Sequence, residues 1–147
     1  MIQEVSLSTV CDIQSGGTPS RSNSTYWGGD ILWSKISDIE KADGIITKTE
    51  EHITNEGLKA IRNRIFSKGT LLFAMYGSVG KTAIAGTKLT INQAILGITI
   101  NNKNVLDVSY LRHWLGSQQL KFMKDARGVA QKNLSAGYIR DLKIPLP

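Results

Sequence analysis

The stretch Gly80-Lys81-Thr82 has the residue types that end a phosphate-binding P-loop, in which backbone N–H groups and the lysine contact a nucleotide. A P-loop also requires a glycine five positions before Gly80, and this sequence has Met75 there. Residues 82–87 have the character of a returning strand, whereas a P-loop opens a helix whose N-terminus faces the phosphates. We therefore expect a hairpin turn that carries Lys81 and binds no nucleotide. Such a turn can also contact a nucleic-acid backbone.

The chain has few residues that could bind a metal or act as a thiol. Cys11 is the single cysteine, which excludes a disulfide within the chain, and its commoner role is that of a small buried hydrophobic residue. His52 and His113 are the two histidines. One cysteine and two histidines do not make a structural zinc site, and no convincing set of residues for hydrolysis stands out. We expect no cofactor and no catalytic role.

The charge is distributed unevenly along the chain. Residues 1–56 hold four basic and nine acidic side chains, a balance of −5, whereas residues 57–147 hold fourteen basic and three acidic ones, a balance of +11. An excess of this size makes the C-terminal part a candidate surface for a polyanion. The alternative is ordinary basicity, in which the lysines are simply hydrated.

Length and composition indicate one globular domain. The 147 residues suffice for a hydrophobic core, and 41% hydrophobic with 20% charged residues is ordinary for such a protein. The sequence contains no apolar span long enough to predict a membrane helix. Its first ten residues lack the basic and apolar regions of a secretory signal. We expect a cytoplasmic protein with no membrane association.

The densest apolar stretch, residues 69–100, predicts the central sheet. Segments 70–75 and 83–85 read as a hairpin around the turn at 76–80, and segment 94–100 as a third adjacent strand. Earlier in the chain we expect a helix beginning at Ser6 or Ser8 and ending at Gly16, with Leu7, Val10 and Ile13 on one face.

Further elements follow the same patterns. Segment 31–36 reads as a strand with Ile31, Trp33 and Lys35 on one face, segment 45–46 as a brief edge strand, and Thr54 as the cap of a short helix. The last third is helical. In this part we expect Asp107 and Ser135 to cap helices and Gly116-Ser117 to break the helical run. After the break, Leu120 and Met123 should face inward, and residues 142–145 should form an edge strand.

Taken together, these residues resemble the target recognition domain of the specificity subunit of type I restriction-modification enzymes. The resemblance covers nearly the whole chain and depends on the order and spacing of several short pieces. These are Ser15-Gly16-Gly17-Thr18-Pro19-Ser20, Tyr26-Trp27, Ile31-Leu32-Trp33, Ile53-Thr54, Gly57-Leu58, Gly69-Thr70-Leu71-Leu72, Tyr76-Gly77-Ser78-Val79-Gly80-Lys81, Asn92-Gln93-Ala94 and Leu142-Lys143-Ile144-Pro145-Leu146-Pro147.

The resemblance implies a non-catalytic module that reads one half of a split target in double-stranded DNA. Its partners would be methyltransferase (modification) subunits that modify adenine, the restriction subunit, and a second recognition domain or second copy. The sequence has no Asn/Asp-Pro-Pro-aromatic tetrapeptide for adenine methylation and no Gly-rich loop for S-adenosylmethionine. The implied fold is α/β of the α+β type, a single domain over residues 1–147 with a twisted, mixed, largely antiparallel sheet flanked by short helices.

One departure concerns the end of the chain. Specificity subunits of this family contain two recognition domains joined by long spacer helices, and this sequence stops at Pro147, where such a helix would begin. We expect an isolated domain, a gene fragment or one half of a split subunit.

Candidate DNA-binding residues are those with a suitable charge or polarity and a position in a loop. Arg21, Lys35, Lys81 and Lys132 are the basic candidates, with Thr18, Ser20, Tyr76, Ser78 and Gln131 as polar neighbours. Phosphate contacts would position the domain, whereas a bidentate arginine on guanine or glutamine on adenine would specify the sequence.

Two alternatives from other functional classes remain at this point. The first is an enzyme that uses Lys81 and Thr82 on a nucleotide, which a nucleotide-binding titration would test. The second is a protein-interaction module whose basic helices bind an acidic partner, which DNA binding by the purified domain would argue against.

Overall fold

The centre of the molecule is a mixed five-stranded sheet, seen in a computed structural model that describes residues 2–126 and 134–146. Neighbouring strands are antiparallel except the last pair, which confirms the expectation of a mixed, largely antiparallel sheet flanked by short helices. The predicted hairpin and third strand are its three central members. In spatial order the strands are β2 (Cys11–Ser15), β9 (Ile95–Ile100), β6 (Leu71–Ala74), β7 (Thr82–Ala85) and the predicted edge strand β4 (Ile45–Ile46).

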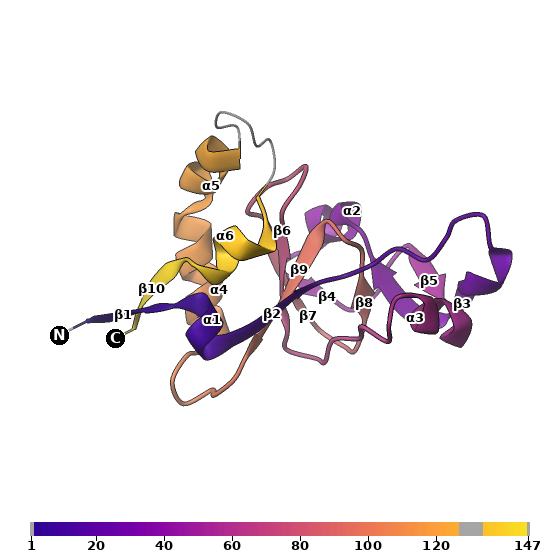
Figure 1. Cartoon of the computed structure of the whole chain (residues 1–147), viewed down its shortest axis with the longest axis horizontal. Coiled ribbons are helices and arrows are strands. Elements are labelled where there is room, and N and C mark those ends of the chain that lie inside the picture. The colour runs from indigo at the N-terminus through magenta and orange to yellow at the C-terminus, as the bar shows by residue number, and fades with distance from the viewer. Residues whose placement is uncertain (1, 127–133, 147) are drawn as a thin grey trace.

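Two smaller sheets extend the molecule at opposite ends (Figure 1). At one end, β5 (Glu51–Ile53), β3 (Trp27–Ser34) and β8 (Thr90–Ile91) form a three-stranded sheet beside α3 (Asn55–Ala60) and the short 3-10 helix η1 (Ser24–Tyr26). At the other end, β1 (Gln3–Ser6) pairs antiparallel with β10 (Lys143–Leu146), the predicted closing strand. This pairing brings the two ends of the chain together.

Alternation along β6 explains why the central sheet is buried on both faces. Leu71 and Phe73 belong to the apolar cluster under the C-terminal helices, whereas Leu72 and Ala74 belong to the cluster on the opposite face. Successive side chains of a strand point to opposite faces, so a continuous apolar run fits a strand that is covered on both sides.

Helices cover the two faces of the central sheet. The first face carries α4 (Val108–Ser117), α5 (Gln119–Ala126) and α6 (Ala136–Arg140), which contribute Leu111, Leu115, Phe122 and Ile139 to the core. The second face is covered by α2 (Ile36–Lys41), through the buried Ile39. None of the helices in the described part of the chain has the length and apolar character needed to cross a membrane.

Three of the predicted helix caps are confirmed. Thr54 Oγ1 accepts from the Gly57 backbone N–H at 3.1 Å, Asp107 Oδ2 accepts from Ser109 and Tyr110, and Ser135 Oγ accepts from Tyr138. Each cap pairs a backbone N–H that the first helical turn cannot satisfy internally.

The predicted N-terminal helix is wrong beyond its first turn. Helix α1 spans only Leu7–Val10, and Ile13 lies in β2 rather than on a helical face. Cys11 and Ile13 are buried while Asp12 is exposed, a period of two that suits a strand. The pairing with β9 decides the conformation, because the backbone of residues 11–15 is satisfied by a strand far away in the sequence.

Two further expectations need correction. Lys35 does not share a strand face with Trp33, because β3 ends at Ser34 and Lys35 is the N-cap of α2. Leu120 does not face inward: 83% of its surface is exposed, while Phe122 and Ala126 are the buried residues of α5. The predicted break at Gly116-Ser117 lies too early in the chain: both residues belong to α4, and the chain turns at Gln118 before α5 starts at Gln119. The buried face of α5 therefore cannot be extrapolated from the pattern in α4.

Candidate nucleic-acid interface

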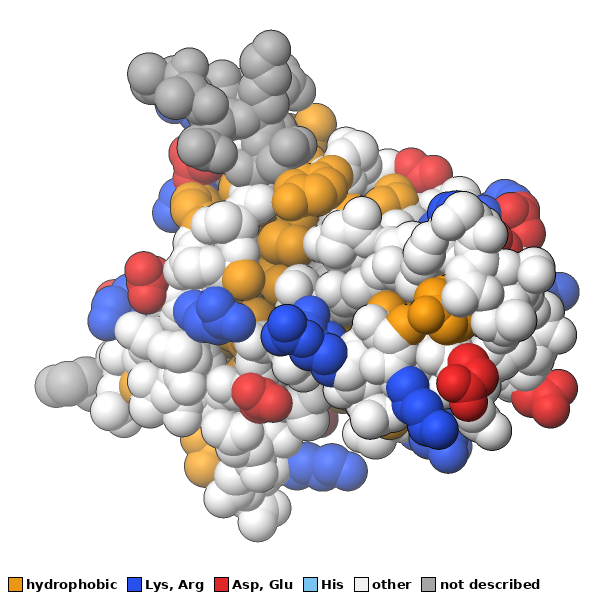
Figure 2. Space-filling view, turned by 45° about the vertical axis from the view of Figure 1, so that its right-hand side comes forward, with side chains coloured by type: hydrophobic (Ala, Val, Ile, Leu, Met, Phe, Trp, Pro, Cys, Tyr) orange, Lys and Arg blue, Asp and Glu red, His pale blue; other side chains and the backbone are white. Residues whose placement is uncertain are grey.

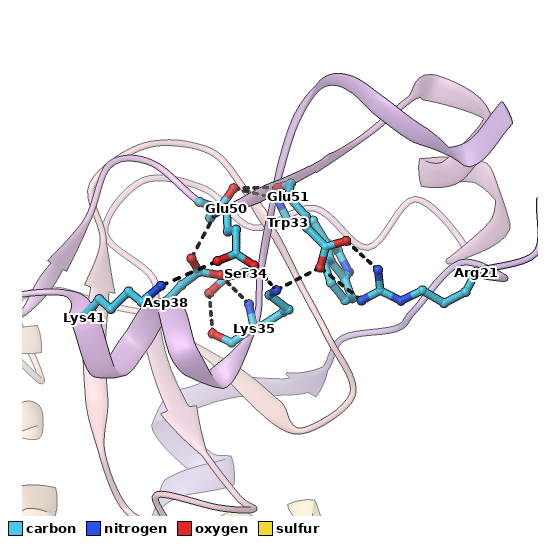
Figure 3. Close-up of polar contacts among 9 residues, drawn as sticks. Arg21, Trp33, Ser34, Lys35, Asp38, Lys41, Glu50 and Glu51 are labelled. Carbon is cyan, nitrogen blue, oxygen red and sulfur yellow. Dashed lines mark hydrogen bonds and ion pairs between the residues drawn. The ribbon is translucent and has the colours of Figure 1, made fainter. Parts of the chain in front are cut away.

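Arg21 and Lys35 meet on the same carboxylate. Both Nη atoms of Arg21 bind Glu51, at 2.5 and 3.1 Å, and Lys35 Nζ lies 3.0 Å from Oε2, the oxygen that Arg21 Nη2 also binds (Figure 3). Lys35 also binds Glu50 at 2.6 Å, and Lys41 approaches Glu50 at 3.5 Å. We call these five residues, with three cations and two carboxylates, the Glu51 network.

The small sheet and α2 position this network. Glu51 pairs with Trp33 across the antiparallel strands β5 and β3. The buried Asp38 of α2 accepts from the backbone N–H of Lys35 at 2.8 Å and from that of Glu50 at 3.1 Å. One carboxylate therefore fixes the backbone of both Lys35 and Glu50, and the ion pairs form between segments that are already in place.

Two tryptophan rings pack against Arg21 of the network. The Arg21 guanidinium lies 4.3 Å from the centre of the Trp27 ring and 5.1 Å from that of Trp33. Their indole N–H groups donate to Ser20 O and Gly17 O, which belong to the loop that carries Arg21. Trp33 is buried and edge-on to Trp27, as expected for core tryptophans, so Trp33 cannot stack on a base.

The ion pairs keep Glu51 charged. Hydrogen bonding from Arg21 is the largest cause that lowers the pKa of Glu51 to about 2, with Lys35 adding to it against the opposing effect of burial. Hydrogen bonding to Glu51 raises the pKa of Arg21, and hydrogen bonding to Glu50, followed by Glu51, raises the pKa of Lys35. Two of the basic candidates are thus paired with carboxylates, and Figure 2 shows basic and acidic side chains interleaved over this end of the molecule.

The turn between β6 and β7 holds Tyr76, Ser78 and Lys81. Tyr76 and Lys81 are exposed, and Ser78 Oγ donates to the carboxylate of Glu40 in α2. Backbone hydrogen bonds from Gly80 to Ala74 O at 2.9 Å and from Lys81 to Ser78 O at 3.0 Å close the turn. The next residue begins β7, so this segment is the expected hairpin rather than a P-loop.

A groove beside this turn contains a basic residue that sequence reasoning did not place there. Arg112 of α4 donates from Nε to Thr82 Oγ1 at 3.2 Å, and together with Lys81, His113 and Gln119 it lines the groove. In the sequence, Arg112 is one of several basic residues in the helical last third. Only the packing of α4 against β7 brings it to Lys81.

Thr18 and Ser20 lie in the exposed loop that leads to Arg21. Thr18 Oγ1 donates to the side chain of Gln93, and Ser20 Oγ lies 2.9 Å from Ser22 Oγ. Asn92 Oδ1 accepts from the Ala94 backbone N–H at 3.0 Å, whereas the Gln93 side chain accepts from Thr18 Oγ1. Gln131 and Lys132 lie outside the described residues.

Helix α2 connects the Glu51 network to the turn between β6 and β7. It starts at Lys35 in the Glu51 network, and Glu40 near its other end accepts from Ser78. Gly77 of the turn also lies close to Ile36. In the described ranges no three histidine, cysteine, aspartate or glutamate side chains group as metal ligands would.

A family model described as "Type I restriction modification DNA specificity domain" matches residues 2–147. The chain belongs to this family. Among its relatives is the specificity subunit of the type I restriction enzyme MjaIX from Methanocaldococcus jannaschii, 31% identical over 144 residues, which cover 96% of this chain and 33% of the relative. The HindI specificity subunit from Haemophilus influenzae is 25% identical over 96% of this chain and 31% of the relative.

Solved structures share the fold. The HsdS subunit from Thermoanaerobacter tengcongensis aligns with a TM-score of 0.77 and 19% identity, over 99% of this chain and 33% of that one. The specificity (S) subunit from M. genitalium aligns with a TM-score of 0.64 and 16% identity, over 99% of this chain and 34% of that one. The resemblance and the fold class drawn from the sequence are thereby confirmed. The chain spans about a third of the length of these relatives.

Proposed function

We propose that this chain is a DNA-recognition module of a type I restriction-modification system, in which it reads one half of a bipartite target. The family match across residues 2–147 is the observation that carries the proposal. Recognition by this module would direct adenine methylation and restriction, which the partner subunits would perform.

The arrangement of the candidate residues supports DNA binding. Lys81 lies in the turn between two strands of the buried central sheet, and Arg112 lies on α4, which packs on that sheet. Arg21 lies in a loop against Trp27 and Trp33 of the three-stranded sheet. A rigid scaffold that presents polar side chains on loops is the usual arrangement of a binding site. The balance of +11 in residues 57–147 would attract the phosphate backbone.

The chain itself would have no catalytic role and need no cofactor. Its partners would be the methyltransferase subunits, the restriction subunit and a second recognition domain or second copy, since a bipartite target has two halves. Because the substrate would be genomic DNA, we expect the protein to act in the cytoplasm.

Methylome sequencing of the source organism tests the proposal. Deleting this gene should remove methylation of one bipartite adenine motif and leave other modified motifs unchanged, and restoring the gene should bring that motif back. Deletion that leaves every methylated motif in place would contradict the proposed function.

A further inference from the structure

Arg21 is held on several sides although 54% of its side chain is exposed. Glu51 binds both Nη atoms, Trp27 lies against the face of the guanidinium, and Lys35 also binds Glu51. These contacts therefore hold a side chain with many rotatable bonds in one orientation. Exposed ion pairs contribute little to stability, so stability alone does not account for this degree of order.

The ion pair leaves part of the guanidinium able to bind. An arginine has five N–H donors in a planar fork, and Glu51 engages one N–H on each Nη. The Nε–H and an outer Nη–H point along another edge of the plane, and no acceptor for Nε of Arg21 is present in the described ranges. Two parallel donors on one edge match the O6 and N7 acceptors that guanine presents in the major groove.

Contacts with phosphate make a different demand. A flexible lysine meets a phosphate as a point charge, as the exposed Lys81 could, and needs no fixed orientation. A base edge is read only when both donors are aligned with both acceptors. The confinement of Arg21 therefore favours base reading over phosphate contact.

We infer that Arg21 reads a guanine in the target half recognised by this chain, and that Glu51, Lys35 and Trp27 position its guanidinium. The inference rests on the proposed function and makes it specific, because it names the side chain, the base and the two acceptor atoms. Arg21 would determine specificity, while Glu51 would act through Arg21 without touching the DNA.

The first test is Arg21→Lys, measured on this chain in complex with the methyltransferase subunits of its system. Lysine keeps the positive charge but loses the planar fork. Affinity for the target duplex should fall roughly ten- to hundredfold, affinity for random duplexes should stay the same, and preference at one G·C pair should disappear. Arg62→Lys is the matched control on an exposed arginine outside the Glu51 network, and it should change neither affinity.

Glu51→Gln tests the positioning role. It should relax discrimination at the same base pair without lowering affinity for random duplexes. If Arg21→Lys lost the same affinity on all duplexes, Arg21 would be a phosphate contact. If Glu51→Gln kept its discrimination between duplexes but melted at a lower temperature, the network would only anchor the loop. Either result would overturn the inference.

The second test changes the DNA, and its first arm uses the native chain alone. Replacing each target guanine in turn by 7-deazaguanine removes the N7 acceptor, and one position in the half-site should weaken binding by a factor similar to that of Arg21→Lys. The same replacement should have no further effect on the Arg21→Lys complex. If no 7-deazaguanine replacement in the half-site weakened binding, the inference would be overturned and the proposed function would stand. If the native complex bound all duplexes with equal affinity, both the proposed function and the inference would be wrong.

Discussion

Glu51 accepts ion pairs from Arg21 and Lys35, so its ionisation links the candidate DNA surface to the stability of the fold. Its pKa in the folded protein is about 2, below the ordinary value of 4.5. A carboxyl whose pKa is lowered by folding stabilises the folded state above its unfolded pKa, and this contribution is lost as pH falls toward the folded pKa.

Replacing this carboxyl should therefore produce a pH-dependent loss of stability. Glu51→Gln should melt at a lower temperature than the parent at pH 7, and the difference should shrink as pH falls from about 4.5 to about 2, where Glu51 itself becomes protonated. Calorimetric melting of both proteins from pH 7 to pH 2 checks this. A difference that is the same at every pH would show that the ionised form of Glu51 does not stabilise the fold.

Lys81 should behave as a surface contact and not as a nucleotide-binding lysine. Its side chain is exposed and the turn is closed by backbone hydrogen bonds, so Lys81→Ala should change the free energy of unfolding by no more than about 0.5 kcal/mol. Titration of the parent with ATP and magnesium should show no saturable binding. DNA affinity of the variant should fall by the same factor on target and random duplexes.

Lys88→Ala is the matched control, since Lys88 is also exposed but lies in the turn after β7, away from the groove. Saturable ATP binding by the parent that Lys81→Ala abolishes would revive the enzyme alternative.

At the scale of elements, close backbone contacts hold the three-stranded sheet against the central one. The loop after β2 passes the backbone that follows β8, where the Gly17 N–H donates to Ile91 O at 3.0 Å. A Cβ on Gly16 would lie 1.9 Å from Ile91 O and 2.6 Å from Asn92 O. Both obstacles are backbone atoms and cannot move aside as a flexible side chain would.

Two glycine-to-alanine substitutions should therefore have opposite effects. Gly16→Ala should cost roughly 2–3 kcal/mol of unfolding free energy, because it forces the two sheets apart. Gly116→Ala is the control: it lies in the last turn of α4 with open space around it, and should gain up to about 1 kcal/mol. Denaturant titrations measure both, and a Gly16→Ala protein as stable as the parent would show that this contact does not join the sheets.

At the scale of the whole molecule, charge separates the two parts of the chain. The five charged side chains of the Glu51 network, near the three-stranded sheet, form ion pairs with one another. The net charge of +11 belongs to residues 57–147, which include the β6–β7 turn and α4. Long-range attraction to DNA should therefore come from residues 57–147, and orientation from the network.

Binding to duplex DNA should depend steeply on salt. Neutralising roughly four to six phosphates predicts a slope of about −4 to −5 for log affinity against log salt concentration, and removing one phosphate contact such as Lys81 should reduce the slope by about 1. Fluorescence anisotropy over a range of salt concentrations measures this. Affinity that stayed flat would argue against electrostatic binding.

Features that depend on neighbouring residues could be predicted from the sequence. The caps at Thr54, Asp107 and Ser135, the hairpin around residues 76–80 and the family resemblance all follow from short segments whose hydrogen bonds or spacing are local. Charge likewise could be counted directly, and Met75 together with the strand-like residues 82–87 argued against a P-loop.

Tertiary structure decided the rest, because the deciding partners are distant in the sequence. Residues 11–15 became a strand only through pairing with residues 95–100, and Arg112 joined Lys81 only through the packing of α4 on β7. The pairing of Arg21 with Glu51 spans 30 positions and brings Lys35 to the same carboxylate. No local sequence pattern predicts this ion pair, because a loop arginine looks the same in the sequence whether water or a glutamate binds it. Only the fold brings Glu51 to Arg21.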